Sequence, residues 1–131
     1  MRYRIQLLKT AAVALGMALA SHAAVAQEQI GVFTVFIGKS DLTNDKGTTL
    51  SEPWKVLRQD RTNFHRFGVS QPGDQWDPYF SSSQSRKSLQ TLIARGSVGS
   101  KAAKRLKNGG IILVSVFGQG NTPSAIKISV P

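Results

Sequence analysis

The stretch that decides the fold lies near the C-terminus: Ile111-Ile112-Leu113-Val114-Ser115-Val116-Phe117, then residues 118–124, then Ala125-Ile126-Lys127-Ile128-Ser129-Val130. The first run is strongly apolar and rich in β-branched residues, which predicts a strand. The last run alternates apolar and polar side chains, as a half-buried strand does. Because residues 118–124 are rich in turn formers, the two strands are expected to pair as an antiparallel hairpin.

A third strand is expected at residues 30–37, where β-branched and aromatic residues are apolar on both alternating faces. That pattern predicts a strand covered on both sides. The next apolar pattern, at residues 51–67, has helical spacing. Ser51 is the expected N-cap, Pro53 suits the first turn and Gly68 suits the stop. Arg61 interrupts the apolar face, and its stem is expected to cover core while its head group reaches water.

Two further helices are expected, at residues 83–95 and at residues 100–108. Leu89, Leu92 and Ile93 have the i, i+3, i+4 spacing of a helix face, and Gly109 suits a helix stop. The chain is therefore predicted to be a small single α+β domain of about three strands packed with two or three helices. Its expected core is Phe33, Val35, Trp54, Leu57, Phe64, Leu113, Val114 and Ile128.

The first 26 residues have the features of a secretory signal peptide. Three cations precede an uncharged apolar run of about ten residues, and Ala24-Val25-Ala26 has the small-x-small pattern of a cleavage site. The run is too short for a bilayer-spanning helix, which needs about 20 apolar residues. Residues 27–131 are therefore predicted to be the mature domain, periplasmic or secreted, with no membrane span after cleavage.

Charge is distributed unevenly over the chain, which has 131 residues, a net charge of +10 and no Cys. The absence of Cys excludes disulfides, thiolate metal sites and a thiol nucleophile. All seven acidic residues lie before Pro78, whereas eight basic residues and no acid follow it. Uncompensated cations attract polyanions, so an acidic partner or a polyanion of the envelope or the extracellular space is the expected partner class. The candidate contacts are Lys101, Lys104, Arg105 and Lys107.

Catalytic candidates are few because His65 is the only histidine of residues 27–131. On the predicted helix it lies near Arg58 and Arg61. A neutral imidazole can act as a general base while arginines bind phosphate, which is the arrangement of a nuclease-like hydrolase. A carboxylate partner is also needed, and only the fold could supply it from Glu52, Asp60, Asp74 or Asp77. The competing interpretation is a histidine at the edge of a helix face.

Residues 71–80 combine three aromatic side chains with two carboxylates around a Pro72-Gly73 turn. Trp76, Tyr79, Asp74 and Asp77 are candidate contacts for a sugar ring or a peptide. The competing interpretation is a loop that folds back, buries Trp76 and Phe80 in the core, and uses Asp77 to cap a helix starting at Pro78.

A calcium loop is a weak alternative for residues 41–52. Asp41, Thr43, Asp45 and Glu52 match positions 1, 3, 5 and 12 of the calcium-binding pattern, but Lys46 occupies the position that needs glycine. No phosphate-loop, dinucleotide or zinc motif is present, so neither a metal nor a cofactor is expected. The favoured function is a small exported, non-enzymatic binding or envelope-associated protein, and the alternative is the secreted nuclease-like hydrolase.

Overall fold

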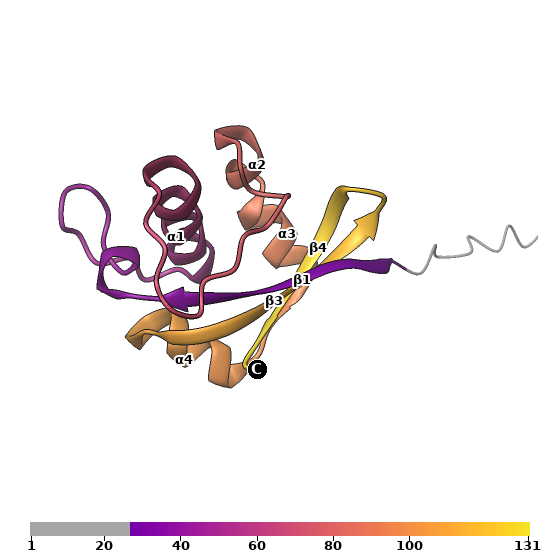
Figure 1. Cartoon of the computed structure of the whole chain (residues 1–131). Coiled ribbons are helices and arrows are strands. Elements are labelled where there is room, and N and C mark those ends of the chain that lie inside the picture. Colours follow the sequence, from indigo (N-terminus) through magenta and orange to yellow (C-terminus); the bar gives the residue numbers. More distant parts are fainter. Residues whose placement is uncertain (1–26) are drawn as a thin grey trace, which may run out of the picture.

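The computed structural model describes residues 27–131, and the predicted signal peptide lies outside these described residues. One sheet has the strand order β1-β3-β4-β2, and the helices follow one another between β1 and β3 (Figure 1). The elements are β1 (Glu28–Ile37), η1 (Lys39–Asp41), α1 (Pro53–Phe67), α2 (Ser83–Lys87), α3 (Leu89–Arg95), β2 (Ser97–Val98), α4 (Ser100–Asn108), β3 (Gly110–Gln119) and β4 (Thr122–Ser129). The predicted α+β class is confirmed.

The sheet contains the three predicted strands and one short addition. β3 pairs antiparallel with both β1 and β4, as the hairpin pattern predicted. β2 was not predicted and pairs parallel with β4 through only two residues. The predicted helix at residues 83–95 is divided at Ser88 into α2 and α3.

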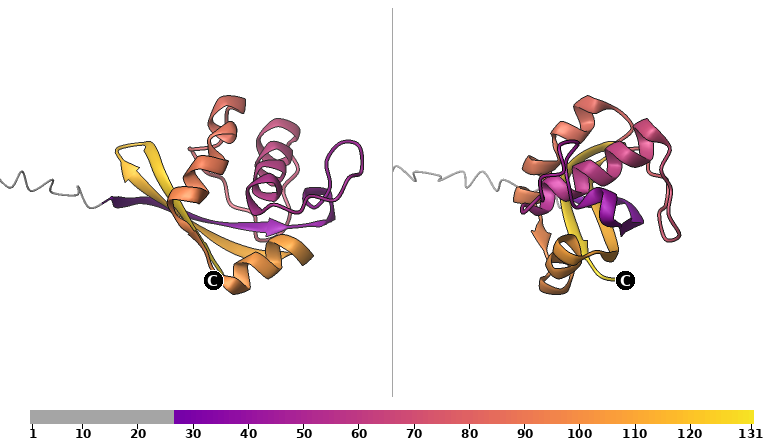
Figure 2. Two further views of the ribbon diagram at one scale, coloured as in Figure 1. Left: turned by 180° about the vertical axis from the view of Figure 1, so that it is seen from behind. Right: turned by 90° about the vertical axis from the view of Figure 1, so that its left-hand side faces the viewer.

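The core lies on one face of the sheet. The register aligns Phe33 with Val114 and Val114 with Ile128, and all three side chains are buried. α1, α3 and α4 contribute Leu57, Leu92 and Leu106 to the same buried cluster, and Figure 2 shows how these helices lie relative to the sheet.

The opposite face of the sheet corrects two expectations. β1 was expected to be covered on both sides, but Val32 is 49% exposed on this second face. Leu113 was expected in the core, yet the register places it beside Thr34 on that face, where it is only half-buried. Trp54 and Phe64, also expected in the core, are half-buried at the flanks of α1.

Leu57 and Leu113 allow a matched test of these two faces. Because Leu57 is fully buried, Leu57→Ala is expected to lower the free energy of unfolding by about 2–5 kcal/mol. Leu113→Ala removes the same atoms from a half-buried position and is expected to cost about 1 kcal/mol. Urea denaturation measures both losses, and equal losses would contradict this assignment of the faces.

The ends of α1 set its position over the sheet. The helix starts at Pro53 with Glu52 as N-cap, so the predicted cap at Ser51 was wrong by one residue. It stops at Gly68, whose φ of 67° is a left-handed conformation that glycine adopts without strain. Further along the chain, Gly96 lets α3 approach β4 closely, since a Cβ there would collide with the carbonyl oxygen of Ile126.

A loop at residues 70–77 covers the free edge of β1 and brings acidic residues beneath α1. Thr34 N–H donates to Gln75 Oε1 at 2.9 Å, and Gln75 N–H donates back to Thr34 O at 3.0 Å. Phe36 N–H donates to Asp74 Oδ1 at 2.8 Å.

Within residues 27–131, no helix has the length and apolar character that crossing a membrane requires.

Candidate functional site

A buried charge cluster lies between α1 and the loop at residues 70–77, centred on Arg61. The Arg61 side chain is 0% exposed. Its Nε donates to Asp60 Oδ2 at 2.8 Å, and its Nη1 donates to Asp77 Oδ2 at 2.9 Å and to Gln75 O at 3.1 Å. The Nη2 atom is 3.6 Å from Asp74 Oδ1 and has no hydrogen-bond partner among the described residues. The expectation that this head group reaches water was therefore wrong.

The Arg61 guanidinium is also enclosed by aromatic rings. Its Cζ lies 5.3 Å from the ring centroid of Phe33 and 4.4 Å from that of Phe64. A guanidinium is weakly hydrated and stacks on aromatic faces, which is why arginine rather than lysine suits this interior position.

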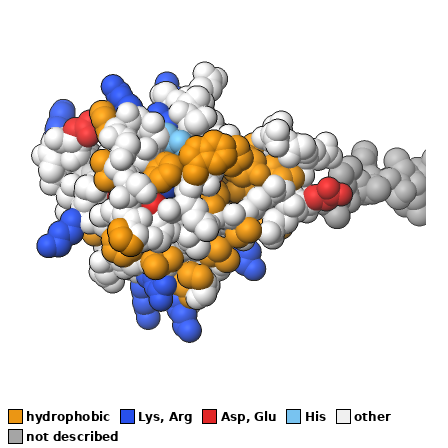
Figure 3. Space-filling view, in the orientation of Figure 1, with side chains coloured by type: hydrophobic (Ala, Val, Ile, Leu, Met, Phe, Trp, Pro, Cys, Tyr) orange, Lys and Arg blue, Asp and Glu red, His pale blue; other side chains and the backbone are white. Residues whose placement is uncertain are grey.

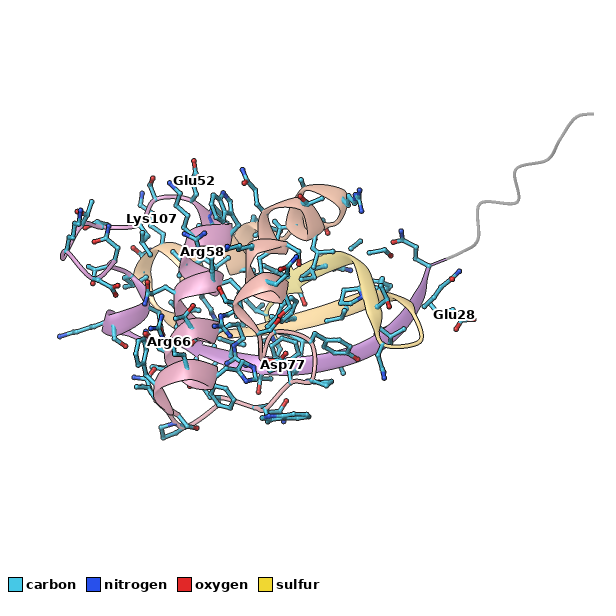
Figure 4. The ribbon with its side chains drawn as sticks, turned by 90° about the horizontal axis from the view of Figure 1, so that it is seen from above. Glu28, Glu52, Arg58, Arg66, Asp77 and Lys107 are labelled. Atoms are coloured by element: carbon cyan, nitrogen blue, oxygen red, sulfur yellow. The ribbon has the colours of Figure 1, made fainter. Side chains whose placement is uncertain are left out.

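Asp77 contacts four groups in this cluster, and Figure 4 labels its position. Its Oδ2 accepts from Arg61 and contacts His65 Nε2 at 2.8 Å, and its Oδ1 accepts from the N–H groups of Tyr79 and Phe80 at 2.8 and 2.7 Å. Asp77 thus organises the following turn, although no helix begins at Pro78 as predicted.

Asp60 has the most altered acidity in the cluster. Burial raises the pKa of the Asp60 carboxyl to about 8, and the nearby Asp41 and Asp74 carboxylates act in the same direction. The Arg61 guanidinium opposes that rise. One buried cation thus faces several carboxylates, and a proton on Asp60 reduces the excess of negative charge.

The predicted catalytic group is only partly assembled. His65 has the carboxylate partner that a general base needs, Asp77, but its side chain is only 5% exposed, which leaves little of the imidazole for a substrate to contact. Arg61 is enclosed by carboxylates and cannot reach a phosphate. Arg58 is the one member that lines a surface hollow.

The candidate contacts in residues 71–80 are separated by the fold. Asp74 and Asp77 point inward to Arg61, and Tyr79 is half-buried with its hydroxyl donating to Ile30 O at 2.7 Å. Trp76 is 67% exposed, so the expectation that it fills the core was wrong. Phe80 is fully buried, as that interpretation predicted.

Of the four cations of α4, three lysines are exposed and the arginine is engaged in a hydrogen bond to the backbone. Lys101, Lys104 and Lys107 are exposed, and Figure 3 shows Lys and Arg side chains projecting from the lower margin, where Figure 1 places α4. Arg105 is half-buried, and its Nη1 donates to Ile111 O at 2.6 Å. It supports the α4–β3 connection, contrary to the expectation that all four cations are free.

Asp41, the first residue of the calcium-binding pattern, has a structural role. Asp41 is 2% exposed, and its carboxylate accepts from Gly38 N–H at 2.9 Å and from Asn63 Nδ2 at 3.0 Å. Asp45 is exposed and Thr43 is half-buried. Within residues 27–131, no group of three or more His, Asp or Glu side chains is arranged to hold a metal ion.

A basic hollow between α1 and α2 was not foreseen. Its volume is about 180 Å³, and no acidic residue lines it. The lining residues are Arg58, Thr62, Arg66, Ser83, Arg86 and Lys87. Part of this hollow could have been predicted from the sequence, because Arg58, Thr62 and Arg66 are spaced four residues apart and therefore share one face of a helix. The contribution of α2 depends on how that helix docks against α1.

A scan against protein-family models and searches of the curated proteins and of the solved structures found no match.

Proposed function

We propose that this protein is a small exported binding protein whose cationic surface contacts a polyanion outside the cytoplasm. The observation that carries the proposal is the absence of carboxylate partners for the basic residues after Asp77. Among the described residues, the carboxylates within 4.0 Å of a basic side chain are paired with Lys55, Arg61 or His65. All of these precede the basic half of the chain.

Most of the unpaired cations face solvent. Six of the eight are exposed: Lys87, Arg95, Lys101, Lys104, Lys107 and Lys127. Cations that are neither paired nor buried retain their attraction for phosphate or sulfate groups, and binding releases the counterions condensed on a polyanion. Export rests on the N-terminal pattern of residues 1–26, and N-terminal sequencing of the exported material tests it, with Gln27 as the expected first residue.

The three exposed lysines of α4 provide the test of polyanion binding. Replacing Lys101, Lys104 and Lys107 by Gln is expected to reduce retention on heparin and to flatten the log–log salt dependence of DNA binding by about two to three units. Arg105 stays in place because it bonds to Ile111 O. Since the three side chains are exposed, the free energy of unfolding should change by less than about 0.5 kcal/mol.

A charge-matched control distinguishes local contacts from net charge. Replacing Lys39, Lys46 and Lys55 by Gln removes three cations from the first half of the chain. Equal loss of retention in both triple variants would show that net charge alone causes binding, and no change in the α4 variant would contradict the proposal.

The nuclease-like alternative has one observation in its favour, the 2.8 Å contact between His65 Nε2 and Asp77 Oδ2. A histidine oriented by a buried carboxylate is a common arrangement of a general base. Cleavage of RNA or DNA by the purified protein, lost in His65→Gln while the fold is retained, would favour this alternative over the non-enzymatic proposal.

A further inference from the structure

The hollow between α1 and α2 gathers like charges that the rest of the fold does not neutralise. Arg58 and Arg66 come from α1, and Arg86 and Lys87 come from α2. Asp77 is the carboxylate whose charge acts on Arg86, but it is fully buried and its oxygens already contact Arg61, His65 and two backbone N–H groups. Bringing cations together in this way destabilises the unliganded fold, and an anion would offset that cost.

Arg86 shows most clearly how the grouped cations destabilise the unliganded fold. It is only 6% exposed, and burial together with the neighbouring Arg66 guanidinium lowers its pKa from the usual value. Its Nη1 donates to Phe80 O at 3.0 Å, which holds one edge of the guanidinium in place. A buried cation that a second cation repels is the kind of group that an anionic ligand stabilises.

Two more arginines of the hollow are held by aromatic rings. The Cζ of Arg58 lies 4.9 Å from the Trp54 ring centroid, and the Cζ of Arg66 lies 5.0 Å from the Phe67 ring centroid. Cation–π contacts of this length restrict a guanidinium that would otherwise be mobile. Side chains that are already positioned lose less conformational entropy when a ligand binds.

The size and the donors of the hollow define its ligand. Its volume of about 180 Å³ is below the 300–1,000 Å³ typical of pockets that enclose a drug-sized molecule. It therefore suits a charged group rather than a complete sugar or base. Guanidinium groups bind phosphate in a forked, bidentate manner, and three of them with one ammonium provide more donors than the two oxygens of a carboxylate can accept.

We propose that the hollow lined by Arg58, Arg66, Arg86 and Lys87 is a discrete binding site for one tetrahedral oxyanion, a phosphate or sulfate group. This inference goes beyond the proposed function, because it requires a saturable site at α1 and α2 rather than a charged surface at α4. Thr62 also lines the hollow, and its hydroxyl donates to Arg58 O within α1 at 2.8 Å.

The test is a calorimetric titration of the purified protein with inorganic phosphate at constant ionic strength. Saturable binding is expected, and replacing Arg66 and Lys87 by Gln is expected to weaken it at least ten-fold. Both residues are exposed, so the double variant should fold, whereas Arg86 is left unchanged because it also bonds to Phe80 O. The matched control replaces Lys101 and Lys104 by Gln, and its phosphate affinity should stay within two-fold of the original.

Further titrations identify the source of the oxyanion. Methyl phosphate represents a chain-terminal monoester, dimethyl phosphate an internal diester and sulfate a sulfated polymer, and saturable binding of any of them supports the site. The proposal is overturned if none of the four anions binds saturably, or if the α4 control weakens binding as much as the hollow variant does. The loss of heparin retention in the α4 triple variant reports on the polyanion proposal, whereas the phosphate titration of the hollow variant reports on this site. Failure of the one and failure of the other are therefore distinguishable.

Discussion

Asp77→Ala is expected to lower the free energy of unfolding by about 3–5 kcal/mol, because it removes the shared partner of a buried charge cluster. The substitution leaves the Arg61 guanidinium in an interior position with one carboxylate contact fewer. It also leaves the N–H groups of Tyr79 and Phe80 without the acceptor that organises their turn. Each unsatisfied buried donor costs about 1–3 kcal/mol. Urea denaturation followed by circular dichroism measures the loss.

Asp45→Ala is the matched control for this measurement, since Asp45 is an exposed aspartate of the first half of the chain. Its free energy of unfolding should change by less than about 0.5 kcal/mol. Asp77→Asn should be nearly as destabilising as Asp77→Ala, because its amide would present one donor group to the donors of Arg61 or of the backbone. If Asp77→Ala were no more destabilising than Asp45→Ala, the cluster would not support the fold.

The parts of the fold that were predicted correctly depend on local patterns. The β3–β4 hairpin follows from two apolar runs around a turn-rich segment, and the C-terminal end of α1 follows from Gly68. β2 has only two residues, Ser97 and Val98, which is too short for any periodic pattern. The second face of β1 was wrongly predicted to be covered because Val32 and Phe36 are apolar, yet Val32 is 49% exposed.

The buried cluster could not be predicted because its charges come from distant parts of the chain. Arg61 and Asp77 are 16 positions apart, and their contact depends on the loop that pairs with β1. An arginine on an apolar helix face ordinarily extends to water. Here, carboxylates and aromatic rings replace that water, and no local pattern distinguishes the two outcomes.

The basic hollow was missed for a related reason. The cations of α4 are close together in the sequence, whereas the hollow combines cations of α1 with cations of α2 that lie 20 residues or more away in the chain. Arg66 and Arg86 come together only when α2 docks against α1. Charge counts therefore predicted only a class of partner, whereas the hollow depends on tertiary structure.

Asp60→Asn is expected to remove most of the pH dependence of stability between about pH 5 and pH 8. Burial raises the pKa of Asp60 to about 8 in the folded chain, from an ordinary value of 3.8. Between these values the folded chain keeps a proton that the unfolded chain has released. Unfolding is then accompanied by proton release, so the free energy of unfolding falls as the pH rises, by about 1 kcal/mol per pH unit.

The variant isolates this effect because an amide cannot ionise and can still accept the hydrogen bond that Arg61 Nε donates to Asp60 Oδ2. The other charged groups facing this position, Asp41 from η1 and Asp74 from the loop, are present in both proteins, as is His65. A difference in slope therefore belongs to Asp60. Denaturation series at about pH 5, 6, 7 and 8 should show a falling stability in the original protein and in an Asp45→Asn control, but a much flatter profile in Asp60→Asn. Parallel slopes in all three proteins would mean that Asp60 is ionised throughout this range, and that Arg61 compensates for its burial.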